Sequence, residues 1–109
     1  MRILKVTQAY YPFLETGGPA VKVRALARAL QHRGHRVTVV TADLGLTQAR
    51  AREAGCVPGR WGWQGAEEGV ESVYLRSLAS YRRLTGNPGA KSFFRQELRQ
   101  YDVVHIYGL

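Results

Sequence analysis

The chain contains 109 residues, of which 45% are hydrophobic and 22% are charged, a composition typical of one small soluble globular domain. It has no run of about 20 apolar residues that could cross a bilayer, and its N-terminus leads directly into a strand pattern rather than a signal peptide, which predicts a cytoplasmic protein. Its formal net charge of +8 favours an anionic partner, but the basic residues are scattered without a nucleic-acid-binding pattern, so no nucleic acid partner is expected.

Two short apolar runs flank a helical pattern near the N-terminus. Residues 2–8, RILKVTQ, and 36–41, RVTVVT, are typical of buried strands. Between them, apolar positions recur at helical spacing from Pro19 to Arg33, and Gly34 is placed to cap the end of the helix. A strand, a helix and a strand in close order predict a parallel pair with a right-handed crossover.

The rest of the chain extends this pattern. Residues 44–69 lack a clear period and contain proline and several glycines, which predicts a long, mobile loop. A third strand is expected at 69–77, a second helix from Asn87-Pro88, and a fourth strand at 102–108. The whole of 1–109 is therefore expected to form a single Rossmann-like α/β domain, with an open, doubly wound, mainly parallel sheet of about four strands and helices on its faces. Because the last strand is followed by no loop and helix, the domain is expected to be partial.

Two glycines and a proline, Gly17, Gly18 and Pro19, precede the first predicted helix. They could form only a tight turn between two elements. Alternatively, they could bring unpaired backbone amides close to a phosphate at the positive end of the helix dipole. The G-x-G-x-x-G pattern of nicotinamide-binding folds is absent, which disfavours an oxidoreductase of that type.

His105 and Tyr107 lie two residues apart in the last predicted strand, so their side chains are expected on one face of the sheet. They could converge on a ligand at the carboxyl end of the strand, and they are the candidate catalytic residues. The alternative for His105 is a hydrogen-bonded core histidine. The single cysteine, Cys56, has no neighbours at metal-ligand spacing, so no metal site is expected.

Both ends of the chain resemble the N-terminal domain of glycosyltransferase family four, the retaining sugar-nucleotide transferases of GT-B fold. The resemblance rests on the stretches YYPFLETGGPAVKVRALARALQHRGHRVTVVTAD and YDVVHIYGL. Within them, the YP and GGPA loop, the helix ending at HRGHRVTVVT and the DVVH strand follow in the order found in the family. In such enzymes two Rossmann-like domains face each other across a cleft, and the N-terminal domain mainly receives the acceptor.

The resemblance also implies roles for individual residues. Gly17, Gly18 and Pro19 would form the loop that approaches the donor diphosphate. His105 would match the first histidine of the His-x-His end of the family's strand, whereas Tyr107 replaces the second histidine. A nucleotide sugar would serve as co-substrate, with no further cofactor and no metal bridging the diphosphate.

The resemblance therefore implies that the chain is the acceptor-side segment of a glycosyltransferase, truncated before the C-terminal domain and inactive alone. The full-length enzyme would use a nucleotide sugar and a glycan or lipid-linked acceptor. It would act in the cytoplasm or at the inner face of the membrane, where the net positive charge is compatible with peripheral contact. The alternative is a stand-alone α/β binding or assembly module that recruits a partner chain or an anionic ligand, the partner chain pairing with the open edge of the sheet.

Overall fold

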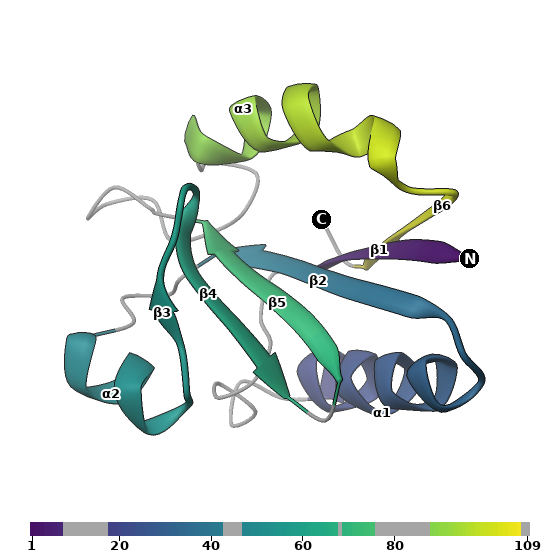
Figure 1. The fold of residues 1–109 in the computed structure, drawn as a ribbon, viewed down its shortest axis with the longest axis horizontal. Helices are drawn as coiled ribbons and strands as arrows, with labels where there is room; N and C mark the ends of the chain where they lie inside the picture. Colours follow the sequence, from purple (N-terminus) through teal and green to yellow (C-terminus); the bar gives the residue numbers. More distant parts are fainter. Residues whose placement is uncertain (8–17, 43–46, 68, 76–87, 108–109) are drawn as a thin grey trace.

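The computed structural model describes residues 1–7, 18–42, 47–67, 69–75 and 88–107, which form a single sheet with helices on its faces (Figure 1). The elements in chain order are β1 (Arg2–Thr7), α1 (Gly18–His32), β2 (Arg36–Ala42), α2 (Gln48–Glu53), β3 (Val57–Pro58), β4 (Gly62–Glu67), β5 (Val70–Leu75), α3 (Pro88–Glu97), the 3-10 helix η3 (Leu98–Gln100) and β6 (Val103–Tyr107).

The sheet has six strands in the order β3-β4-β5-β2-β1-β6. The four strands predicted from the sequence, β1, β2, β5 and β6, are parallel to one another. They lie side by side in the order β5-β2-β1-β6, which is the strand order of a doubly wound fold. The fold class predicted from the sequence is therefore confirmed, with β4 added antiparallel to β5 and β3 antiparallel to β4 at one edge.

β1 lies inside the sheet because its neighbours on both sides pair with it over most of its length. Ile3 pairs with Val37 on β2 and with Val103 on β6. Leu4 and Val6 are almost completely buried on the face opposite Ile3. An apolar run without strict alternation is the sequence pattern expected of a strand that is covered on both faces.

Helices cover the two faces separately, with α1 on one side of the sheet and α3 on the other (Figure 1). On the first face, Val23 and Ala27 of α1 pack against β1 and β2. On the second face, Phe93 of α3 packs against strand residues and meets Trp61 edge-to-face, with ring centroids 5.5 Å apart. The amphipathic pattern of each helix thus selects the face that it covers.

The C-terminal end of α1 shows how the sequence sets a boundary. Gly34 has a φ of 90°, and its N–H donates to the carbonyl of Gln31 at 3.0 Å. The N–H of His35 donates to the carbonyl of Leu30 at 3.2 Å. This pair of bonds satisfies carbonyls that the helix leaves open, and the positive φ favours glycine. The predicted glycine cap is confirmed, and the chain is turned back into β2.

The prediction of a long loop at 44–69 is wrong for residues 47–67, which contain α2, β3 and β4. Thr47 caps α2, its hydroxyl accepting a hydrogen bond from the Arg50 N–H at 3.2 Å. Beyond α2, Cys56 and Tyr74 form a small buried cluster with the helix. These elements are too short to produce a recognisable hydrophobic period, so the proline and glycines of the segment were the stronger signal and suggested a loop. The expected mobility of this segment stays a prediction.

None of the helices in the described part of the chain is long and apolar enough to cross a membrane.

Candidate functional site

The two candidate catalytic residues lie on β6, the edge strand beside β1. In the parallel register, His105 pairs with Lys5 and Tyr107 pairs with Thr7. Both side chains contact one group, the ammonium of Lys5. The expectation that His105 and Tyr107 share a face is therefore met, although their catalytic role stays a prediction.

Lys5 is the residue at this site that sequence reasoning missed. Only 1% of its surface is exposed, although it is charged and lies on an interior strand. Its Nζ lies 3.0 Å from Nδ1 of His105 and donates to the hydroxyl of Tyr107 at 2.7 Å. The sequence did contain a signal for this residue, namely a lysine inside a short apolar strand. The two-residue period of a strand places its side chain on the same face as the apolar Ile3, and therefore toward the interior.

The chemistry of lysine fixes the proton positions in this cluster. An ammonium can only donate hydrogen bonds, so Nδ1 of His105 must accept, and the proton of the neutral imidazole then lies on Nε2. Partial desolvation of the exposed His105 side chain and the charge of Lys5 both lower the pKa of His105 from its usual value of 6.5, which favours this neutral form. The hydroxyl of Tyr107, which accepts from Lys5, keeps its own proton for another partner.

A hollow of about 340 Å³ opens between β6 and α1 beside this cluster. Its lining consists of Lys5, Leu26, Ala29, Leu30, Arg33, His105 and Tyr107. The apolar residues come from α1, and the polar groups come from β1, from β6 and from Arg33, which directly follows α1. Polar donors thus face an apolar wall, an arrangement common in small-ligand sites.

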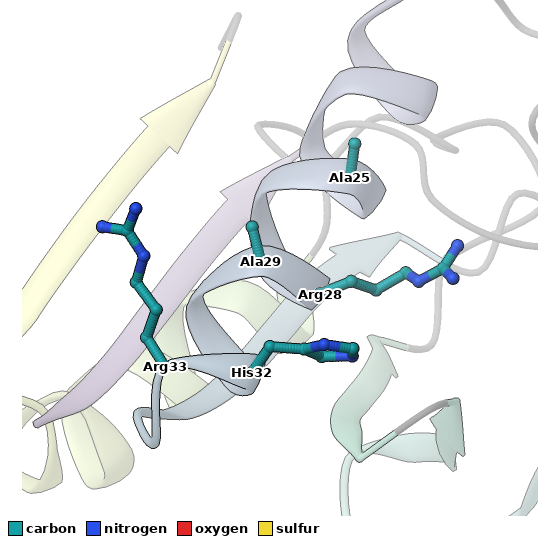
Figure 2. A pocket seen from close by; sticks show the side chains of 5 residues that line it. All are labelled: Ala25, Arg28, Ala29, His32 and Arg33. Carbon is teal, nitrogen blue, oxygen red and sulfur yellow. The ribbon is translucent and has the colours of Figure 1, made fainter.

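A second, shallower hollow of about 490 Å³ lies on the outer side of α1 (Figure 2). It is lined by Ala25, Arg28, Ala29, His32 and Arg33. Ala29 and Arg33 border both hollows. In Figure 2 the side chain of Arg33 is turned away from those of Arg28 and His32.

The proposed phosphate loop is only partly described by the structure. Gly17 lies outside the described residues, whereas Gly18 and Pro19 are the first two residues of α1. Because the other end of α1 leads into the amino end of β2, the Gly18 end of the helix lies toward the carboxyl edge of the parallel strands (Figure 1). That is the ligand edge of a doubly wound sheet, and the diphosphate role of the loop stays a prediction.

Within the described ranges, no group of three or more His, Cys, Asp or Glu side chains is placed to hold a metal ion. Cys56 is buried, and burial raises the pKa of its thiol. A protonated thiol is a poor nucleophile and a poor metal ligand, so Cys56 is suited to its packing role beside Tyr74.

The fold and the position of the site together define an α/β domain of the Rossmann type with a candidate ligand site at its sheet edge. The family model described as "Glycosyl transferase 4-like domain" matches residues 17–109. The chain therefore belongs to the glycosyltransferase 4-like domain family. Neither a curated protein nor a solved structure shows a significant match to this chain.

The lowered pKa of His105 predicts a pH-dependent stability. The described groups that line the site with His105 are Lys5 on β1, Tyr107 on β6 and Arg33 after α1. The unfolded chain takes up the imidazole proton more readily than the folded protein does. The free energy of unfolding should therefore fall as the pH drops below about 6.5, and it should stop falling once the pH is below the lowered pKa of His105 in the folded protein.

Urea unfolding of the protein and of His105→Gln between pH 5 and pH 8 measures this effect. The glutamine can still accept from Lys5 but does not titrate, so the variant should lose less stability over the acid half of the range. Parallel pH profiles for the two proteins would contradict the assignment.

Proposed function

We propose that this chain is the N-terminal, acceptor-side segment of a retaining glycosyltransferase that uses a nucleotide sugar. The match to the glycosyltransferase 4-like family over residues 17–109 carries the proposal. The parallel strand order β5-β2-β1-β6 supports it, because a doubly wound sheet presents its ligand edge at the carboxyl ends of these strands.

The donor diphosphate would be approached by the loop at Gly17, Gly18 and Pro19. α1 supports this role because it begins at Gly18 and has no acidic residue in its first turn. Unpaired N–H groups and the positive end of the helix dipole would then face the phosphates without a competing carboxylate. His105 and Tyr107, near the carboxyl end of β6, are the candidates for contact with the reacting sugars.

A second, C-terminal domain would complete the cleft and hold most of the nucleotide sugar, so the chain alone would have little or no transferase activity. The acceptor would be a glycan or a lipid-linked sugar. The net charge of +8 supports work in the cytoplasm near the anionic inner face of a membrane.

The phosphate role of the loop is tested by placing a negative charge at the start of α1. Gly18→Asp should weaken the binding of UDP or GDP by about tenfold or more, since the new carboxylate would repel the diphosphate. Ala25→Asp is the matched control, because it adds the same charge to the exposed side of the same helix, away from its first turn.

Ligand-observed NMR titrations of the three proteins provide the measurement and can follow the weak binding expected of half a site. Equal affinities of the two variants for the nucleotides would contradict the role of the loop. Clear sugar transfer by the purified chain would contradict the proposed need for a second domain.

The alternative function is a binding or assembly module, and one observation favours it. In the described residues β6 pairs with β1 alone, and Ile106 on this strand is 63% exposed. An edge with free backbone groups and an exposed apolar side chain is able to pair with another chain.

Size-exclusion chromatography with light scattering separates the two functions. The glycosyltransferase segment is expected to be monomeric at micromolar concentrations, and Ile106→Lys should leave its elution unchanged. A defined dimer that Ile106→Lys dissociates would support the module instead, because a charged residue on an edge strand opposes pairing.

A further inference from the structure

The polar groups that the Lys5 cluster can offer to a ligand are hydrogen-bond donors. Nδ1 of His105 is engaged by Lys5, which leaves Nε2–H as the free group of the imidazole. The oxygen of Tyr107 accepts from the same ammonium, so its O–H is free to donate. By occupying the acceptor atoms of His105 and Tyr107, Lys5 leaves each side chain with a free hydrogen-bond donor.

The charges around the hollow, like its hydrogen-bond donors, favour an anionic ligand. The described lining of the hollow contains two cationic side chains, Lys5 and Arg33, and no carboxylate. The acceptors of Lys5 are a neutral imidazole and a phenol, so its charge is hydrogen-bonded without being neutralised. A buried cation in this state attracts an anion strongly, because the protein interior screens charge poorly.

We propose that the hollow between α1 and β6 is a binding site for an oxyanion, the carboxylate or phosphate group of a small ligand. Nε2–H of His105, the O–H of Tyr107 and the guanidinium of Arg33 would donate to the oxyanion. Lys5, almost completely covered, contributes its charge and orients the two side chains on β6. The apolar wall of Leu26 and Leu30 would receive the carbon skeleton of the ligand.

This site is separate from the glycine loop of the proposed donor site. α1 has 15 residues and is therefore about 22 Å long. Gly18 begins the helix, whereas the helix residues that line the hollow start at Leu26, eight residues or about 12 Å further along its axis. In the described part of the chain, the lining of the hollow therefore shares no residue with the glycine loop, so a variant at Gly18 distinguishes the two sites.

The three histidines of the chain provide a direct test by proton NMR. Inorganic phosphate and acetate are titrated separately into the protein at constant ionic strength, and the ring resonances of His32, His35 and His105 are followed. The His105→Gln variant assigns its resonance. A saturable shift confined to His105 is expected, and the anion with the lower apparent Kd identifies whether the site prefers phosphate or carboxylate.

Variants establish whether the shift reports the proposed site. Lys5→Met should weaken the binding of the anion by at least about tenfold, and Tyr107→Phe should weaken this binding by a smaller factor. His32→Gln, at an exposed position on the outer side of α1, is the control and should leave the titration of His105 unchanged. Gly18→Asp should likewise leave it unchanged, which separates this site from the donor loop.

Two results would overturn the proposal. One is a shift of His105 that stays linear and no larger than those of the other histidines. The other is a saturable shift that survives Tyr107→Phe and Lys5→Met unaltered. If Lys5→Met fails to fold by circular dichroism, Tyr107→Phe on the half-buried edge strand decides the question alone.

Discussion

The hydrogen bonding of the Lys5 ammonium is the interaction on which the arrangement of the two ends of the chain depends. Lys5 is a charged residue on an interior strand, and burial of its charge is tolerated only where acceptors are supplied. Those acceptors, His105 and Tyr107, come from β6, about 100 residues further along the chain. β6 therefore completes the polar interior as well as the pairing of β1.

The same constraint links the fold to the candidate site. β1 must be covered on both faces, so α1 and α3 lie on opposite sides of the sheet. The side of β6 that faces α1 then becomes a hollow, with donors on one wall and apolar residues on the other. Membership of the glycosyltransferase 4-like family draws attention to the carboxyl ends of the parallel strands, near which α1 begins, since ligands of doubly wound folds bind there.

The parts predicted from sequence are those in which a local pattern and the tertiary structure agree. Short apolar runs predicted the parallel strands, and Gly34 and Pro88 marked helix ends that the structure retains. The prediction was wrong for residues 47–67, because the six-residue helix α2 is stabilised by packing with Tyr74 of β5 and the two-residue strand β3 by pairing with β4, rather than by any period of their own. The shared face of His105 and Tyr107 followed from the two-residue period, whereas the partner Lys5 required the register between β1 and β6.

The hydrogen bond from Lys5 to Tyr107 couples these two side chains directly in the folded protein. A double-mutant cycle with Lys5→Met, Tyr107→Phe and the double variant, followed by urea unfolding at pH 7, measures that coupling without any ligand. A direct hydrogen bond to a buried ammonium predicts that the double variant is more stable than the sum of the single effects by at least about 1 kcal/mol. Additivity within about 0.3 kcal/mol would show that the two side chains do not interact and would contradict the account.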